Sequence, residues 1–435
     1  MVTYLLHPFK IFNHPVKGLK PEYQLQYATG LSMILWYASN GDVRVKILFE
    51  AWISAISQNT IPHWPKRRLS TFRMIIKTKK ALSTKLDGFK LINMRQSFIF
   101  DCFYILQTVN PAYVERAYEV LRHDICGPVT RFVALNDIHS YFLGKLEGEY
   151  LQVSNDLVRL REKEQKFQSK PEKRILIVAT MNAGKSTLVN AITGYKINKV
   201  KNSSCTTRLR YLYNKPFDDG LIKMYSDGTY QYQSVINLLD DNVSTASFHF
   251  NQEISDRICL IDTPGVNSKK NIEYAKSTLK AIKENKYDIL IFVSNANYLE
   301  TDDEAELMRF TIKHCKRPII YVLNKLDSLS PEDDSISEMV KDYKDFIMRM
   351  KGKPIIIPLS AYTTFLLKSK KCLSTTSEMD LRLIVEKFNN QYYNLESYAY
   401  LGNLPLPKTP KNLLSLTGYN LLECVIKYMI SNEKS

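Results

Sequence analysis

The chain has 435 residues, of which 45% are apolar and 24% are charged, and its formal net charge is +16. These values are ordinary for a folded protein of two or three domains, so a disordered, collagen-like or small disulfide-bonded chain is excluded. The seven cysteines are odd in number and never spaced as CxxC, which argues against a zinc site and favours a cytoplasmic location.

The first 140 residues have a helical pattern. The apolar-rich segments PEYQLQYATGLSMILWYASN and VRVKILFEAWISAIS are separated by the turn signal Asn40-Gly41-Asp42, which predicts two packed helices. We therefore expect residues 1–140 to form an all-α N-terminal domain, whose role the pattern does not identify. The region has no run of about 18 apolar residues that could span a membrane, and the start of the chain lacks the features of a secretory signal.

A strongly basic stretch lies within this region. Between Lys66 and Arg95 the chain carries ten lysine or arginine residues and one acid, Asp87. Such an excess of positive charge can contact an anionic membrane surface or the phosphates of a nucleic acid. A solvated helix face balanced by acids elsewhere is the plain alternative. Peripheral membrane association, nucleic-acid binding and a purely structural role all stay open for this stretch.

Residues 141–170 carry apolar residues in steps of three and four. This spacing predicts one long amphipathic helix that connects the N-terminal domain to the rest of the chain. Pro171 would end the helix, because proline cannot continue it. The apolar positions of the predicted helix are Leu143, Leu146, Tyr150, Val153, Leu157, Leu160 and Phe167.

After Pro171, strand-like and helix-like segments alternate, beginning with RILIVATMNAGKSTLVNAITG. A strand, a loop of small residues and a helix starting at Lys185 can wrap phosphates with backbone N–H groups at the helix N-terminus. We expect Lys185 to reach the β- and γ-phosphates and the Ser186 hydroxyl to bind Mg²⁺. Ala179 departs from the pattern G-x-x-x-x-G-K-[ST], which begins with glycine. The predicted phosphate-binding residues are Ala183, Gly184, Lys185, Ser186 and Thr187.

The strand-like run RICLID is followed by Thr263, Pro264 and Gly265. An Asp at the end of a strand with a Gly three residues later is the arrangement with which nucleotide-dependent switches sense a γ-phosphate. We expect Asp262 to hold Mg²⁺ through water and the Gly265 amide to face the terminal phosphate.

Two further strands end on residues that suit a guanine base. The run PIIYVL leads into Asn324, Lys325 and Asp327, at the carboxyl end of a strand, where open α/β sheets bind ligands. The Asp327 carboxylate can accept two hydrogen bonds from the N1–H and N2–H₂ edge of guanine, which adenine does not present. The run PIIIPLSA ends at Ser360 and Ala361, where a backbone N–H can meet the guanine O6. The predicted ligand is therefore a guanine nucleotide.

These motifs, in the order ATMNAGKS, DTPG, NKLD and SA, resemble the P-loop GTPases over about residues 172–367. The resemblance implies an α/β domain with a mostly parallel sheet over residues 171–368, GTP and Mg²⁺ as cofactors, and hydrolysis of GTP to GDP and phosphate. A helical tail, residues 369–435, would pack on this domain. The family places a switch threonine that closes on Mg²⁺ between the phosphate loop and DTPG. Thr206 is the favoured candidate and Thr207 the alternative.

Within this class the sequence resembles the bacterial dynamin-like GTPases. The shared segments are MNAGKSTLVNAI, DTPGVNS with the helix IEYAKSTLKAIKEN, the strand YDILIFVSNA, and DDEAELMRFTI. Only 67 residues follow Lys368, so the long stalk of dynamin relatives does not fit. The resemblance implies nucleotide-driven conformational change, self-association as a homodimer through the nucleotide face, and action at a membrane.

Two other functions stay open. Era-like GTPases, which mostly serve the ribosome or tRNA, share the asparagine at the place of Asn182, so an assembly factor that binds RNA is the nearest alternative. A regulatory subunit that binds GTP and controls a partner protein, for instance in bacterial defence against phage, is the third. The sequence does not identify the protein partner.

The catalytic step departs from two known patterns. Ras-type enzymes have Gln directly after DxxG, whereas this chain has Val266, and Met181 replaces the phosphate-loop Gln of dynamin. In relatives with Asn at the place of Asn182, its side-chain oxygen helps to hold a K⁺ ion beside the phosphates. Bracing of the loop is the alternative role. The predicted catalytic residues are Lys185, Thr206, Asn182 and Gly265, and the predicted metal ligands are Ser186, Thr206 and Asp262.

Overall fold

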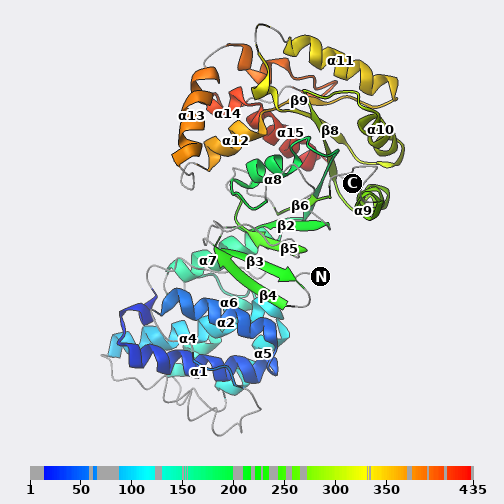
Figure 1. Ribbon diagram of the computed structural model, residues 1–435. Coiled ribbons are helices and arrows are strands. Elements are labelled where there is room, and N and C mark those ends of the chain that lie inside the picture. The colour runs from blue at the N-terminus through cyan, green and yellow to red at the C-terminus, as the bar shows by residue number, and fades with distance from the viewer. Residues whose placement is uncertain are drawn as a thin grey trace. The chain divides into compact units, whose positions relative to one another are not determined.

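The computed structural model divides the chain into two units, Met1–Ser169 and Lys170–Ser435 (Figure 1). Each unit has its own apolar core. No helix among the described residues is long and apolar enough to cross a bilayer. The residues that the structure describes are 14–57, 62–65, 88–122, 130–148, 151, 153, 155–198, 209–216, 221–226, 229–234, 243–250, 257–264, 272–330, 332, 335–369, 375–388, 391–405 and 409–432.

The first unit is helical throughout its described part. The two packed helices expected at its start are α1 and α2. The turn between them contains Asn40 and Gly41 with φ of +53° and +77°, the left-handed conformation that Asn and Gly tolerate best. Asp42 then caps α2 by accepting a hydrogen bond from the Arg44 N–H. The elements of this unit are η1 (Pro15–Gly18), α1 (Pro21–Ser39), α2 (Val43–Ile56), α4 (Gly88–Val109), α5 (Ala112–Val120), α6 (Thr130–Phe142) and α7 (Asn155–Gln168).

A buried carboxyl group on α7 is held by the helices around it. The Tyr104 hydroxyl on α4 donates to Glu164 Oε2 at 2.5 Å. Burial raises the pKa of Glu164 to about 7, outweighing the lowering by the Tyr104 hydrogen bond and the nearby Arg161 charge. Arg161 itself lies over the rings of Tyr141 and Phe142, 4.3 and 4.2 Å from their centroids. The core of this unit is therefore sensitive to the ionisation of a single acid.

The structure has α6 and α7 in place of the single helix expected over residues 141–170. Gly144 adopts a left-handed φ of +73°. Its N–H bonds to the Tyr141 carbonyl at 3.0 Å, and the Lys145 N–H bonds to the Ser140 carbonyl at 2.8 Å, which is the Schellman pattern that ends a helix. The apolar spacing alone was misleading because it takes no account of the glycine at which the helix stops.

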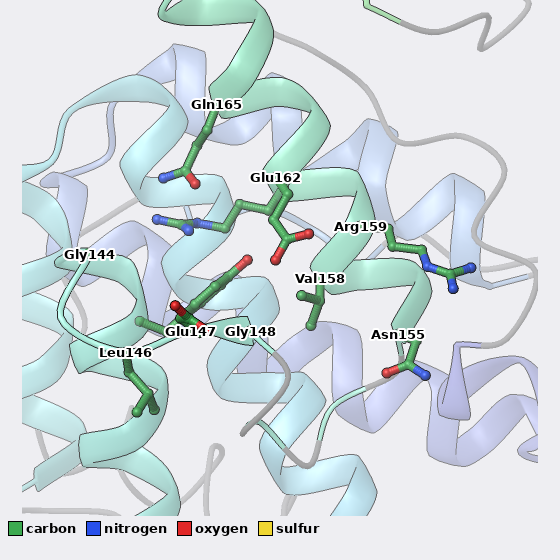
Figure 2. A pocket seen from close by; sticks show the side chains of 11 residues that line it. Gly144, Leu146, Glu147, Gly148, Asn155, Val158, Arg159, Glu162 and Gln165 are labelled. Carbon is green, nitrogen blue, oxygen red and sulfur yellow. The ribbon is translucent and has the colours of Figure 1, made fainter.

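A pocket of about 510 Å³ lies between this turn and α7. Figure 2 shows Val158, Glu162 and Gln165 projecting from α7 toward the segment that holds Gly144 and Gly148. Gly148 approaches the helix so closely that a Cβ there would lie 2.2 Å from Val158 Cγ1. A glycine at this position therefore lets the turn pack directly on α7.

The second unit is an α/β fold with a mostly parallel sheet. Among its described residues the sheet has nine strands in the order β4-β3-β5-β2-β6-β1-β7-β8-β9 (Figure 1). β1 pairs in parallel with β6 and β7, and β8 with β7 and β9, whereas β2 runs antiparallel to β6. The strands are β1 (Lys173–Ala179), β2 (Arg210–Asn214), β3 (Leu221–Ser226), β4 (Thr229–Ser234), β5 (Thr245–Phe248), β6 (Ile258–Asp262), β7 (Ile289–Asn295), β8 (Ile319–Asn324) and β9 (Ile356–Pro358).

The central strands are apolar runs that are buried along their whole length, as in β6 and β7, which is typical of parallel strands covered on both faces. Parallel strands present their carboxyl ends at one edge, so the segments after β1, β6, β8 and β9 meet there. The helices of this unit are α8 (Lys185–Thr193), α9 (Ile272–Glu284), α10 (Asp302–His314), α11 (Ile336–Arg349), α12 (Ala361–Lys368), α13 (Thr375–Phe388), α14 (Leu413–Leu416) and α15 (Tyr419–Asn432), with short 3₁₀ turns η4 (Leu326–Ser328), η6 (Gln391–Tyr393) and η7 (Leu395–Tyr398).

The C-terminal segment belongs to the same unit as the sheet. Gly418, with φ of +80°, approaches β9 so closely that a Cβ would lie 1.9 Å from the Pro358 carbonyl oxygen. The Ser360 N–H also bonds to the Thr417 carbonyl at 3.0 Å. The apolar side chains of α15 that lie in the core of this unit are Tyr419, Leu421, Leu422, Val425, Ile426 and Met429.

Candidate nucleotide-binding site

The predicted strand, loop and helix around the phosphate motif are β1, residues 180–184 and α8. Gly184 precedes α8 with a left-handed φ of +91°. A Cβ on this glycine would lie 2.2 Å from Asn324 Nδ2, so a side chain here would displace Asn324. Asn182 also has a positive φ, +61°, and its carbonyl accepts a hydrogen bond from Asn295 Nδ2 at 3.4 Å.

Asn324, at the carboxyl end of β8, connects two of the predicted motifs. Its Nδ2 donates to the Ala183 carbonyl at 3.0 Å, and its Oδ1 accepts from the Ala361 N–H at 3.0 Å. One buried amide therefore holds the phosphate loop and the SA segment together. These two bonds are a structural role beside the predicted role of Asn324 in binding the base.

Lys185 and Asp262 form a buried ion pair at the centre of the site. Lys185 Nζ lies 2.5 Å from Asp262 Oδ1, with side-chain exposures of 7% and 0%. The second oxygen, Oδ2, accepts from Asn198 Nδ2 at 3.1 Å. Thr263 then bonds through its hydroxyl to the Ile177 carbonyl of β1 at 2.8 Å, which fixes the end of β6 beside the phosphate loop. Both oxygens of the predicted metal-binding carboxylate are thus engaged.

The predicted base-recognition residues lie side by side. The Ser360 hydroxyl donates to Asp327 Oδ1 at 2.7 Å and also bonds to Thr363 Oγ1 at 2.7 Å. Lys325 has a left-handed φ of +71° and precedes the turn η4 that carries Asp327. The structure therefore brings the NKLD and SA motifs together, and it gives the Asp327 carboxylate a fixed orientation.

Thr206, Thr207, Gly265 and Val266 lie outside the described residues, as does most of the basic stretch, Lys66–Asp87. The end of that stretch is in α4. Ser186 and Thr187 lie in the first turn of α8 and are half-buried.

Four residues outside the predicted motifs also contribute to the site, and the sequence analysis did not identify them. Asn198 and Arg210 bond to each other at 2.6 Å behind Asp262. Asn295 ends β7 at the same sheet edge, and its position there was the one available signal. Lys387 of α13 donates to the carbonyls of Asp327 and Leu329.

The donors present suit a magnesium-bound triphosphate. Mg²⁺ prefers oxygen ligands and is commonly held by one or two protein oxygens together with phosphate oxygens. The Ser186 hydroxyl and the Asp262 carboxylate are oxygens of this kind. Lys185 provides a buried ammonium group beside them, and Gly184 leaves the backbone of the loop free of a side chain. The residues at this edge therefore fit the predicted cofactors.

Comparison with known proteins agrees with this geometry. The sequence profile of a family described as 50S ribosome-binding GTPase matches residues 174–325. GTPase Era of Histophilus somni (strain 129Pt) is 25% identical over 231 residues, which are 53% of this chain and 62% of that protein. GTPase Era of Haemophilus influenzae (strain PittGG) is 27% identical over 192 residues, 43% of this chain and 48% of that protein. The chain thus spans between about half and 62% of the length of these curated relatives.

Two solved structures are also similar. A complex of Era with MgGDPNP and nucleotides 1506–1542 of 16S ribosomal RNA has a TM-score of 0.29 and 18% identity, covering 56% of this chain and 61% of that one. A chain of an oligomerised bacterial dynamin pair has a TM-score of 0.34 and 17% identity, covering 95% of this chain and 62% of that one. The profile match, with the motif geometry described above, identifies a P-loop GTPase domain.

Proposed function

We propose that this protein binds GTP with Mg²⁺ and hydrolyses it to GDP and phosphate, as a nucleotide-dependent switch. The observation that carries the proposal is the set of hydrogen bonds that joins the phosphate loop, the NKLD motif and the SA segment at one sheet edge. Asn324 bonds to the phosphate loop and to the SA segment, and Ser360 bonds to Asp327. Motifs that are already held together support nucleotide binding, because less conformational entropy is lost when the ligand binds.

Each residue has a proposed task. Lys185 and the backbone of Ala183–Thr187 bind the phosphates, Ser186 and Asp262 hold Mg²⁺, and Asp327 selects guanine. When bound, Mg²⁺ neutralises charge that develops on the phosphates. In this proposal Lys185, which bonds to Asp262 here, turns its ammonium group toward the phosphates when the nucleotide binds. The remaining proposed residues are Thr206 as a metal ligand and catalytic residue, Gly265 as the sensor of the γ-phosphate, and Asn182 as a ligand of K⁺.

The proposal is tested by titrating the purified protein with fluorescent GTP and GDP, with ATP as competitor, and by measuring phosphate release. We expect guanine nucleotides to bind and ATP to compete weakly. Lys185→Ala should lose most GTP affinity and hydrolysis, whereas Lys280→Ala on the exposed side of α9 should retain both. Equal affinity for GTP and ATP would contradict the assignment of Asp327.

For the process that the switch serves, the first candidate is a dynamin-like activity. The motif segments that resemble bacterial dynamin-like GTPases support it, together with the helical unit before the GTPase domain. In this proposal the protein self-associates through its nucleotide face and acts at an anionic membrane, which the basic stretch Lys66–Arg95 would contact.

The second candidate is an Era-like role in which the same basic stretch binds RNA. The curated relatives support it, because those reported above are GTPase Era at 25% and 27% identity. Measuring GTP turnover against protein concentration, together with co-sedimentation on anionic liposomes and on structured RNA, separates the two. Turnover that rises with concentration and liposomes supports the first candidate. Turnover independent of concentration, with RNA binding alone, supports the second.

A further inference from the structure

Asn198 is a buried side chain that joins three elements of the nucleotide site. Its Nδ2 donates to Asp262 Oδ2 at 3.1 Å, and its Oδ1 accepts from Arg210 Nη1 at 2.6 Å. Its backbone N–H and carbonyl bond to the Asn190 side chain of α8 at 2.9 and 3.1 Å. All four residues are at most 3% exposed, so these bonds are made away from solvent.

The chemistry of its neighbours allows the Asn198 amide a single orientation. A guanidinium group donates hydrogen bonds and cannot accept them, and an ionised carboxylate accepts and cannot donate. With Arg210 on one side and Asp262 on the other, the amide oxygen must face Arg210 and the NH₂ group must face Asp262. A flipped amide would oppose donor to donor and acceptor to acceptor, which is costly in a buried site.

Arg210 is itself fixed in place. β2 runs antiparallel to β6, and Arg210 is the register partner of Asp262. Its Nε donates to the Val243 carbonyl at 3.1 Å. An arginine keeps its positive charge at any ordinary pH. The positive charge of Arg210 therefore lies next to the Asn198 oxygen. It polarises the amide, so that the NH₂ group becomes a stronger donor to the Asp262 carboxylate.

The two hydrogen-bond partners of the Asp262 carboxylate are expected to behave differently when a nucleotide binds. Lys185, on Oδ1, is needed at the phosphates when a nucleotide binds. Asn198, on Oδ2, is held by Arg210 and by Asn190 and has no other proposed task. Asn198 is thus the contact that remains to orient Asp262 when Lys185 leaves.

We propose that Asn198 and Arg210 are positioning residues for the Mg²⁺ ligand Asp262. This inference rests on the proposed function of the site as a GTP·Mg²⁺ pocket. Groups that hydrogen-bond a metal ligand from behind set its orientation, and their replacement typically costs about 10- to 100-fold in metal affinity. Asn198 supplies that hydrogen bond here, and Arg210 sets the direction of the Asn198 amide.

The test measures the affinity of a fluorescent GDP analogue at increasing free Mg²⁺, and again in EDTA, for the full-length chain. We expect Asn198→Ala to raise the Mg²⁺ concentration at half-maximal effect by about 10- to 100-fold, with the affinity in EDTA unchanged. Arg210→Met should shift the same midpoint in the same direction by a smaller factor. If Arg210 acts through Asn198, the double variant should shift it no further than Asn198→Ala alone.

Asn214→Ala is the matched control. Asn214 is an equally buried asparagine on the same strand as Arg210, and its side chain bonds to the Phe250 N–H at 2.9 Å. Its loss should cost stability without moving the Mg²⁺ midpoint. If Asn198→Ala does not fold, the Mg²⁺ midpoint of Arg210→Met alone tests the inference.

Two results overturn the inference. One is a Mg²⁺ midpoint in both variants equal to that of the wild type. The other is an equal loss of affinity in EDTA and in Mg²⁺, which would assign these residues to folding alone. Failure of the wild type to bind GDP under any condition would instead overturn the proposed function, so the two failures are distinguishable.

Discussion

Lys387, on α13, donates a hydrogen bond from its ammonium group to the backbone carbonyl of Asp327. The same group bonds to the Leu329 carbonyl at 3.2 Å, and the Tyr393 hydroxyl bonds to that carbonyl at 2.8 Å. A helix beyond the last nucleotide motif therefore holds the turn that carries Asp327, the residue proposed to select guanine.

Replacing this lysine should weaken nucleotide binding without removing base selectivity. Lys387→Met loses two charged hydrogen bonds to the turn, and we expect GTP and GDP to bind about ten-fold more weakly, or by about 1.4 kcal/mol. Faster dissociation should account for most of the change. Arg382→Met, at an exposed position of the same helix, is the control in stopped-flow measurements. Equal dissociation rates for the two variants would show that Lys387 does not hold the turn.

Asp327 should determine which base is bound. Asp327→Asn replaces one acceptor oxygen with an NH₂ group that opposes the guanine N2–H₂, and we expect GTP affinity to fall by about 100-fold or more. Xanthosine triphosphate, which has a carbonyl at that place, should bind the variant better than GTP does. Competition binding measures both values. The exposed Asp345→Asn on α11 should behave as wild type, and unchanged GTP binding by Asp327→Asn would contradict the assignment.

Hydrolysis should depend on the monovalent cation if Asn182 holds K⁺. The Asn182 backbone is left-handed, and its carbonyl bonds to Asn295, so the residue is fixed in the phosphate loop. Replacing K⁺ by a larger organic cation should slow turnover at least about ten-fold, because a positive charge placed at the phosphates is a large catalytic contribution.

Asn182→Ala provides the control for this cation effect. Its turnover in K⁺ should match that of the wild type in the organic cation, with GTP affinity retained. A wild-type rate that is the same in all cations would leave Asn182 with the role of bracing the loop.

The helical unit should lose stability as the pH rises. The pKa of Glu164 is about 7 in the folded chain and near 4.5 when unfolded, so the folded state binds the extra proton between these values. The contribution of protonated Glu164 to the stability of the folded state is fully present below pH 4.5. It is lost as the pH rises through 7. The shift corresponds to about 3 kcal/mol of unfolding free energy. Glu164→Gln should remove this dependence.

The measurement is hydrogen exchange of the α7 amides in the full-length chain at pH 5 and pH 7.5, corrected for the intrinsic exchange rate. Glu162→Gln, at an exposed position of the same helix that lines the pocket, is the control and should follow the wild type. The explanation is incorrect if Glu164→Gln and Glu162→Gln show the same dependence on pH.

Much of the nucleotide site could be predicted because its residues follow strands. Lys185 begins the helix after β1, Asp262 ends β6 and Asp327 follows β8, and parallel strands bring their carboxyl ends to one edge. Local sequence therefore carried information about a long-range arrangement. The same reasoning could have included Asn295, which ends β7 at that edge.

The contacts behind the site could not be predicted in this way. Arg210 lies beside Asp262 because β2 pairs antiparallel with β6 in a particular register, and Asn198 is held between them by Arg210 and Asn190. No local sequence pattern specifies these long-range contacts. The helix expected over residues 141–170 was misjudged for a different reason. Apolar spacing describes which side of a helix is buried, but Gly144 determines where the helix ends.

The close approach of Gly418 to Pro358 limits how far the protein can be shortened. A polypeptide that ends at Lys368 would keep every nucleotide motif but would lack α15. Its core would then lack the side chains of Leu422 and Val425. The strands they cover would then face water, and such a fragment should aggregate. The smallest piece that folds and binds nucleotide on its own should therefore extend through Asn432.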